Sequence, residues 1–186
     1  MEKLLIVDTS IFRAINGVHY SIIHSFMFIV SLAGELATIW FLLAAIILYK
    51  NKQEGKKIFI LMTLAIIMTL LINHLVIAYF LFRDRPYIAL QDVYQLGKRW
   101  TDSSFPSGHV SSAMAATVVL GRYYKKYLPY MIGFVILTMI SRVSLGMHYP
   151  LDVFGGVIVG LISGYGIFYL YRLFLGSRNG GPKGAR

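Results

Sequence analysis

The chain has 186 residues, of which 57% are hydrophobic and only 14% are charged, and its mean hydropathy is +0.66. Because a soluble domain carries roughly 25% charged residues, this composition excludes a soluble globular protein and predicts a single-domain integral membrane protein. The chain contains no cysteine, which excludes disulfides and thiolate metal sites. Its net charge of +10 is better explained by basic residues beside membrane spans than by a nucleic-acid partner, which we do not expect.

Residues 1–17 contain acids and only a short apolar run, so they lack the pattern of a cleavable signal peptide. We expect an amphipathic helix that lies at the membrane interface. His19 and His24, which follow this segment, are expected at the interface as well.

Residues 18–175 are predicted to form one all-α transmembrane domain. A span needs about 20 apolar residues, and four stretches meet that length: 59–82, 106–124, 127–149 and 151–174. The stretch 20–49 is too long for one span and divides at Gly34-Glu35, which gives a bundle of about six transmembrane helices with a short first helix. Residues 176–186 are Gly-rich and basic, and they are predicted to be a flexible tail, either native or an expression scar.

Basic residues gather in the connectors 50–57 and 121–126 and in the C-terminal tail. The positive-inside rule makes the face that carries them cytoplasmic. If the spans alternate and their number is even, both termini are cytoplasmic. The outer face then receives the loop 83–105, the turn 145–152 and Gly34-Glu35, so most of the unusual polar residues gather at outer helix ends.

His148 and Asp152 are the first candidates for chemistry on that face. Pro150 suits the first turn of a helix, which places Asp152 in the same turn. There the carboxylate can accept one imidazole N–H and leave the other ring nitrogen as a nucleophile or base. For this pair alone, an acid favoured by the helix dipole beside an interfacial histidine explains the pattern equally well.

Two arginines lie at helix ends of the same face. Arg142 belongs to an apolar helix and must face a cavity or a partner, since an arginine left in lipid costs at least about 2.5 kcal/mol. Arg85 is held by Pro86, and two guanidinium groups aimed at one point suit phosphate oxygens. The alternative is snorkelling to lipid headgroups, which we favour for Arg83 and not for Arg85 or Arg142.

The tetrapeptide from Pro106 to His109 opens another apolar helix. Ser107 can cap this helix, Gly108 lets an oxyanion approach backbone N–H groups, and His109 can protonate a leaving oxygen. Alone, the tetrapeptide is more simply an N-cap followed by an incidental histidine. Together with the Arg-x5-His-x3-Asp spacing it fixes seven positions, each matched by chance roughly one time in twenty, so we predict a phosphate site.

At these motifs the chain resembles the type-2 phosphatidic acid phosphatase superfamily, whose membrane members dephosphorylate lipid phosphates and pyrophosphates. The family pattern is K-x6-R-P, P-S-G-H and S-R-x5-H-x3-D. The matches fall within about residues 55–172: Arg85-Pro86, Pro106 to His109, and Ser141-Arg142 with His148 and Asp152.

The resemblance implies hydrolysis without a metal or another cofactor, in which His148 attacks phosphorus and forms a phosphohistidine. It also implies that Asp152 orients His148 and that His109 protonates the leaving group. The phosphoryl oxygens would be held by Arg85, Ser107, Gly108 and Arg142.

The first motif departs from the family, because Ala78 stands where its lysine is expected. Lys98, Arg99 or Arg83 could supply the missing cation. The undecaprenyl pyrophosphate phosphatases of the superfamily often lack that lysine, which favours this subgroup. They often carry aspartate where this chain has Gly108, which counts against it.

Undecaprenyl pyrophosphate in the outer leaflet of a bacterial-type inner membrane is therefore the first substrate hypothesis. A site at helix ends can admit a headgroup while the lipid tails stay in the bilayer. Phosphatidylglycerophosphate, phosphatidate and lipid A 1-phosphate are alternatives. A non-catalytic lipid-binding protein is a second class, and a transporter ranks last because it would need ionisable residues near the bilayer midplane. The oligomeric state is left open.

Three further polar residues need an explanation. Glu35 is expected on the active-site face, where it either lines the headgroup pocket or is a helix-cap acid. Asn73 and His74 are expected to form a packed, hydrogen-bonded pair in the core.

Overall fold

The computed structural model describes residues 2–18 and 21–179. Within these residues every regular element is a helix, which confirms the all-α prediction. The elements are α1 (Glu2–Asn16), α2 (Ser21–Gly34), η1 (Glu35–Ala37), α3 (Thr38–Lys50), α4 (Lys52–Phe80), α5 (Pro86–Ala89), α6 (Gly108–Tyr123), η2 (Lys125–Tyr127), α7 (Leu128–Ser144) and α8 (Pro150–Asn179).

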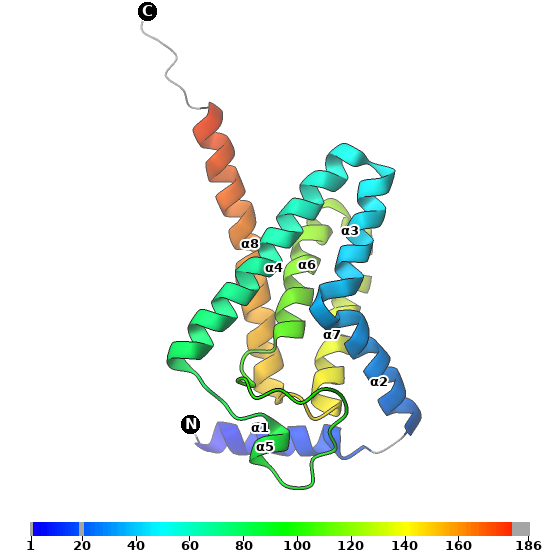
Figure 1. Ribbon diagram of the computed structural model, residues 1–186, viewed down its shortest axis with the longest axis vertical. Helices are drawn as coiled ribbons and strands as arrows, with labels where there is room; N and C mark the ends of the chain where they lie inside the picture. Colours follow the sequence, from blue (N-terminus) through cyan, green and yellow to red (C-terminus); the bar gives the residue numbers. More distant parts are fainter. Residues whose placement is uncertain (1, 19–20, 180–186) are drawn as a thin grey trace, which may run out of the picture.

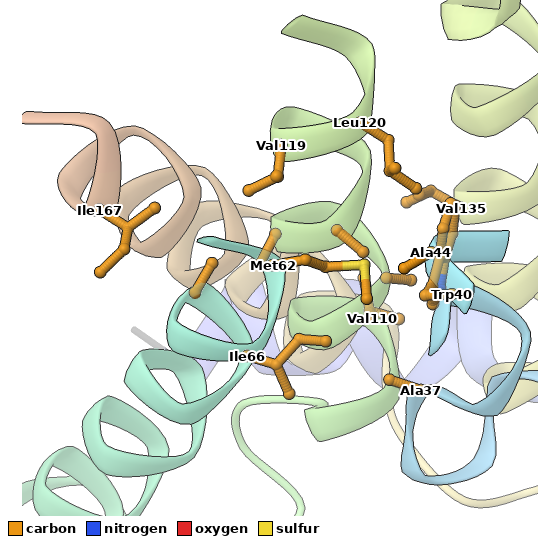
Figure 2. Packing of buried hydrophobic residues seen from close by; sticks show 14 of the residues in the cluster. Ala37, Trp40, Ala44, Met62, Ile66, Val110, Val119, Leu120, Val135 and Ile167 are labelled. Carbon is orange, nitrogen blue, oxygen red and sulfur yellow. The ribbon is translucent and has the colours of Figure 1, made fainter. Parts of the chain in front are cut away.

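Helix α6 is the centre of the bundle, and it packs against α4, α7 and α8 (Figure 1). Its residues from Val110 to Gly121 are buried except for the half-buried Met114. This surrounded position explains why α6 is rich in small and hydroxyl residues and less apolar than its neighbours, since it faces protein rather than lipid. The hydrophobic core lies around it, where side chains of α3, α4, α7 and α8 meet α6 (Figure 2).

Helices α6 and α8 approach each other closely through glycines of α8 at every fourth position, Gly156, Gly160 and Gly164. A Cβ atom at Gly160 would lie 2.5 Å from the Cβ of Met114 and 2.6 Å from the carbonyl oxygen of Ser111. Only glycine allows the two backbones this distance, as in other small-residue interfaces of membrane helices.

The chain breaks at Gly34-Glu35 as predicted, but α2 and α3 do not form two opposed spans. Both run along α7 in one direction. As the chain proceeds from α2 to α3, its contacts on α7 move toward the N-terminal end of α7. The pairs are Met27 with Ser141, Gly34 with Thr138 and Trp40 with Phe134. The two helices therefore make a single broken passage, and the prediction of two separate spans here is wrong.

This path also bears on the predicted topology. Helix α1 lies across one end of the bundle, whereas α8 ends at the opposite end (Figure 1). This arrangement does not support the prediction that both termini lie on the cytoplasmic side, because that prediction assumed one more reversal of the chain.

Within residues 2–18 and 21–179, three helical segments are long and apolar enough to cross a membrane: Lys52–Leu75, Lys125–Ser144 and Pro150–Phe174. A fourth is added if α1 and α2, bent by 113° from each other, count as one broken span. The count of about six spans is thus not confirmed. Helix α6 has only 16 residues, and it is enclosed by longer helices.

The two ends of the chain differ from prediction in detail. The N-terminal helix is present, and its exposed side includes Leu4, Ile6 and Ile11. Helix α8 continues to Asn179, past residue 176 where the predicted tail begins, while 180–186 lie outside the described residues. His19 also lies outside them. His24 is buried and stacks on Tyr94 with ring centroids 4.2 Å apart, so its predicted place at the interface is wrong.

The contact between α6 and α8 gives the first prediction. Gly160→Ala should lower the free energy of unfolding by about 1–3 kcal/mol, because the added methyl group has no space. Gly133→Ala on α7 is the matched control, since nothing lies within 4 Å of a Cβ there. Alanine favours a helix over glycine, so the control should be neutral or stabilising. Thermal unfolding in detergent compares the two, and equal effects would contradict the close packing.

Candidate active site

Four segments meet at the end of the bundle where α1 lies: the loop after α4, the start of α6, the end of α7 and the start of α8 (Figure 1). They border a cavity of about 830 Å³. The predicted site residues that line it are Glu35, Arg85, Lys98, Gly108, His109, Arg142 and His148. The other predicted site residues, Arg83, Arg99, Ser107 and Asp152, lie outside this lining.

His148 is buried in the turn between α7 and α8. Its Nδ1 lies 2.7 Å from the carbonyl oxygen of Ser104. Because a carbonyl oxygen can only accept a hydrogen bond, Nδ1 carries the ring proton and Nε2 keeps a lone pair. Nε2 lies 3.3 Å from Nη1 of Arg85, and both residues line the cavity. The basic nitrogen of His148 therefore faces the cavity.

The expected hydrogen bond between His148 and Asp152 is not formed, since Nδ1 and Oδ2 are 4.0 Å apart. Asp152 is fully buried, and its carboxylate accepts three other hydrogen bonds. The donors are the Ser104 hydroxyl at 2.6 Å, the Tyr149 N–H at 2.8 Å and Arg83 Nη1 at 2.7 Å. Ser104 donates its hydroxyl to Asp152 and offers its carbonyl to His148, so Asp152 acts on the imidazole through Ser104.

Arg83 does not reach toward lipid headgroups, so the favoured interpretation from the sequence is wrong. Its guanidinium bridges Asp8 of α1 and Asp152 of α8, at 2.6 Å and 2.7 Å. Burial disfavours the charge of Arg83, but the carboxylates of Asp152 and Asp8 outweigh that effect and raise its pKa. Arg83 is therefore a permanent cation whose two terminal nitrogens are each bound to a carboxylate.

Arg85 lies at the cavity wall and is held by the loop before α6. Its Nε and Nη2 donate to one carboxylate oxygen of Asp102, at 3.1 Å and 2.8 Å, and its Nη1 donates to the carbonyl of Met147 at 3.1 Å. The Asp102 side chain is 66% exposed. A carboxylate at the solvent side of Arg85 thus takes the place that an anionic oxygen of a ligand would take.

Arg142 is buried at the end of α7, and its Nη1 donates to the hydroxyl of Ser31 at 2.6 Å. Its Nε is buried and has no hydrogen-bond partner among the described residues. Glu35 lines the same cavity. Of the two alternatives for Glu35, a residue of the headgroup pocket or a helix-cap acid, this position agrees with the first. Arg142 therefore keeps donor capacity for an anion.

The start of α6 has the predicted form, with Ser107 at the N-cap position and Gly108 as the first helical residue. The Ser107 hydroxyl makes no capping hydrogen bond and is buried without a partner among the described residues. The first backbone N–H groups of a helix also have no partner within the helix. His109 follows at the cavity wall. This end of α6 thus offers several donors to an anion.

The sequence predicted that Asn73 and His74 form a hydrogen-bonded pair in the core. Asn73 is buried and donates to the hydroxyl of Ser111 at 3.1 Å, so it is hydrogen-bonded in the interior, but to Ser111 and not to His74 as predicted. His74 is exposed and lines the cavity, so the same prediction is wrong for it. Asn73 lines the same cavity, so the two residues differ in burial and in hydrogen bonding rather than in the space they border.

Of the three cations suggested in place of the lysine missing at Ala78, the structure brings Lys98 to the cavity. Its Nζ lies 4.2 Å from the ring centroid of Trp100, which lines the cavity too. Arg99 is exposed and donates to Gln95 at 3.1 Å, away from the cavity lining.

The charge state of His148 follows from its surroundings. Burial, followed by the positive charges of Arg142 and Arg85, holds its pKa well below the ordinary value of 6.5. Both effects disfavour the imidazolium. His148 is therefore neutral at neutral pH, with the lone pair of Nε2 available.

The carboxylates and histidines of the site are dispersed. Across residues 2–18 and 21–179, no group of three or more histidine or acidic side chains is placed to hold a metal ion. Asp152 is occupied by Arg83, Ser104 and Tyr149.

Residues 58–174, more than half of the chain, match the PAP2 superfamily. The chain belongs to this superfamily. The resemblance drawn from the three sequence motifs is thereby confirmed.

Several relatives of this PAP2 protein are named as phosphatases or diphosphatases. It is 36% identical over 164 residues to the undecaprenyl-diphosphatase BcrC of Bacillus subtilis, covering 87% of this chain and 83% of that protein. It is 24% identical to the lipid A 4'-phosphatase of Porphyromonas gingivalis, covering 96% of this chain and 78% of that protein. The crystal structure of Aquifex aeolicus LpxE superposes with a TM-score of 0.73 at 27% identity, covering 87% of this chain and 94% of that one. This PAP2 protein is accordingly a lipid phosphatase, a hydrolase of phosphoric esters.

Sequence reasoning missed Asp8, Ser104 and Asp102. Ser104 and Asp102 precede the Pro-Ser-Gly-His motif by a few residues, and their polar character in an apolar chain was the available signal. Asp8 gave no local signal, because its partners Arg83 and Leu151 are 75 and 143 residues away.

The contact between Arg85 and Asp102 gives the second prediction. Asp102→Asn removes a negative charge that competes with an anion for Arg85. Inorganic phosphate should therefore raise the unfolding temperature of this variant more than that of the wild type, because a ligand that binds the folded state more tightly stabilises it more. Asp92→Asn is the control, since Asp92 is exposed and its φ of 58° suits asparagine. Equal shifts in all three proteins would show that Asp102 does not compete.

Proposed function

We propose that this PAP2 protein hydrolyses a lipid pyrophosphate or phosphate through a phosphohistidine on His148, with undecaprenyl pyrophosphate as the preferred substrate. The observation that carries the proposal is the position of His148. Its unprotonated Nε2 faces a cavity whose wall also holds Arg85, Arg142 and His109. A neutral nucleophile among cations suits attack on an anionic phosphoryl group.

In the first step, the lone pair of His148 Nε2 forms a bond to phosphorus and the bond from phosphorus to the leaving oxygen breaks. His109 gives a proton to that oxygen. In the second step, a water oxygen attacks phosphorus, its proton returns to His109 and the P–N bond breaks. Inorganic phosphate leaves, and His148 again has its lone pair.

Four groups are proposed to hold the phosphoryl oxygens. Arg85 and Arg142 supply guanidinium donors, while the Ser107 hydroxyl and the N–H groups at Gly108 supply the end of α6. Substrate binding would displace Asp102 from Arg85, which exchanges one anionic partner for another. The buried hydroxyl of Ser107, without a partner among the described residues, supports this placement.

Asp152 is proposed to orient the nucleophile through Ser104. The Ser104 carbonyl fixes the ring proton on Nδ1 and can stabilise the positive charge that develops on the ring during attack. Asp152 holds the Ser104 hydroxyl at 2.6 Å and so fixes that carbonyl.

The shape of the cavity supports a lipidic substrate. Its lining includes the apolar side chains of Leu70, Phe82 and Trp100, and their exposed fractions are 55%, 67% and 41%. A headgroup can reach the arginines while its hydrocarbon stays against these side chains. Lys98 beside Trp100 is placed to meet a second phosphate, which supports a pyrophosphate and offers the cation absent at Ala78.

The proposed orientation puts the cavity on the outer face of the membrane. Lysines gather in the connector between α3 and α4 and around η2, at the end of the bundle opposite the cavity (Figure 1). Basic connectors remain on the cytoplasmic side. Helix α1 then lies on the outer face with the cavity.

The function is tested by phosphate release from purified protein in detergent, with undecaprenyl pyrophosphate, phosphatidylglycerophosphate, phosphatidate and lipid A 1-phosphate compared at equal concentrations. We expect the highest kcat/KM for undecaprenyl pyrophosphate and full activity in EDTA. His148→Ala should abolish turnover and prevent labelling of the protein from a ³²P-labelled substrate. Absence of release from every lipid, loss of activity in EDTA, or a labelled phosphoenzyme in His148→Ala would each contradict the proposal.

The depressed pKa of His148 predicts the pH dependence. Because the neutral imidazole is the reactive form, activity should be retained below pH 6.5 and lost as the pH falls through the lowered pKa. Arg142→Gln removes one of the charges that lower this pKa, so the acid limb of its residual kcat/KM should move to higher pH. Arg142→Lys keeps the charge and is the control. A limb at the same pH in both variants would assign the ionisation to the substrate.

A further inference from the structure

We propose that Asp8, on the N-terminal helix, is a positioning residue of the active site, which holds Arg83 against Asp152. This inference rests on the proposed function and assigns part of the catalytic machinery to α1. The side chain of Asp8 is 1% exposed, although hydrophobic residues on both sides of it along α1 are exposed, among them Ile6 and Ile11. A carboxylate is buried this completely only where donors satisfy it.

Both carboxylate oxygens of Asp8 have partners in the site. Oδ2 accepts a hydrogen bond from Arg83 Nη2 at 2.6 Å, and Oδ1 accepts one from the backbone N–H of Leu151 at 2.9 Å. Leu151 is the second residue of α8 and directly precedes Asp152. Asp8 therefore satisfies an amide in the first turn of the helix that carries Asp152, from a helix more than a hundred residues away in sequence.

Arg83 transmits this contact to Asp152. Its Nη1 donates to Oδ1 of Asp152 at 2.7 Å, while its guanidinium lies 3.8 Å from the ring centroid of Tyr149. With one fork on each acid, Arg83 cannot move toward Asp8 or toward Asp152 without breaking a charged hydrogen bond. The position of the Asp152 carboxylate is thus set from both sides, by Arg83 and by Ser104.

The rest of α1 docks on the same loops. Phe12 and Asn16 follow Asp8 at intervals of four, so the three residues lie on one face of the helix. Phe12 contacts the Tyr149 ring with centroids 5.4 Å apart. Asn16 donates to the carbonyls of Tyr94 and Ser144, at 2.7 Å and 2.9 Å. This face of α1 contacts residues before and after His148, so the position of Asp8 relative to the site is fixed by several contacts.

Removal of the Asp8 charge would leave Arg83 with Asp152 as its one carboxylate partner and let both shift. The shift would pass to Ser104 and then to the imidazole of His148. Arg85 and Arg142, which hold the phosphoryl group in the proposed mechanism, make no hydrogen bond to Asp8 or Arg83 among the described residues. Loss of positioning should therefore lower kcat and leave KM nearly unchanged.

The experiment measures kcat and KM of Asp8→Asn, Arg83→Gln and the double variant on undecaprenyl pyrophosphate. Asparagine keeps an oxygen for the Leu151 amide but loses the charge, so α8 keeps its N-terminal contact. We expect kcat of Asp8→Asn to fall about 10- to 100-fold, the size expected when a reacting group is misplaced by about 1 Å. KM should stay within about twofold, and the double variant should be no slower than Arg83→Gln, because both changes break one chain of contacts.

Asp92→Asn, the same chemical change at an exposed position, is the matched control and should keep wild-type kcat. All variants are compared by unfolding temperature and by elution as a single species in detergent. If Asp8→Asn does not fold, Asp8→Glu replaces it. That variant keeps the charge but moves the carboxylate by one methylene, and positioning still predicts a lower kcat at unchanged KM.

An unchanged kcat in folded Asp8→Asn would overturn the inference, as would additive losses in the double variant. A lower unfolding temperature with wild-type kcat would mean that Asp8 only stabilises the fold, which also overturns it. A wild-type protein that releases phosphate from none of the lipids would instead overturn the proposed function, and the positioning role with it. The two failures are distinguished by the activity of the wild type.

Discussion

The arrangement of the loops at the cavity end of the bundle depends on one fully buried carboxylate, that of Asp152. A buried carboxylate is tolerated only when donors satisfy it, and each donor here comes from a different part of the chain. Ser104 comes from the loop before α6, Tyr149 from the turn after α7, and Arg83 from the loop after α4. The requirement to satisfy Asp152 therefore gathers three separate connections around His148. The hydrogen bonds that satisfy the buried Asp152 carboxylate therefore also hold the candidate active site in order.

The close contact of α6 and α8 helps to hold these residues in place. The glycines of α8 let the two backbones approach, and at their first turns the N–H of Ser107 donates to the carbonyl of Asp152 at 3.0 Å. That hydrogen bond joins the start of the anion-binding helix to the start of the helix that holds the acid. A wider spacing of the two helices would separate Ser107 from Asp152, so the packing of the bundle and the geometry of the cavity are linked.

Much of this could be predicted from the sequence, because local signals were sufficient. Hydropathy located the long helices, Pro150 marked the start of α8, and the three motifs include Arg85, Gly108, His109, Arg142 and His148, which line one cavity. The direction of α3 could not be predicted, since a break at Gly34-Glu35 is compatible with either a reversal or a kinked continuation. The contacts of His148 and Arg83 were also missed, because a short spacing such as that of His148 and Asp152 does not fix which acceptor an imidazole meets.

The continuous path of α2 and α3 has a consequence for the cavity. A reversal at Gly34-Glu35 would have placed this break at a membrane surface, whereas the kinked passage brings it beside α7 and the start of α6, where Gly34 and Glu35 line the cavity. The break thus brings Gly34 and the acid Glu35 into the same cavity lining as Arg142. Irregular backbone is tolerated at membrane depth where it lines a polar cavity. The break in the first passage and the cavity therefore depend on each other, and α1 closes the same end from outside.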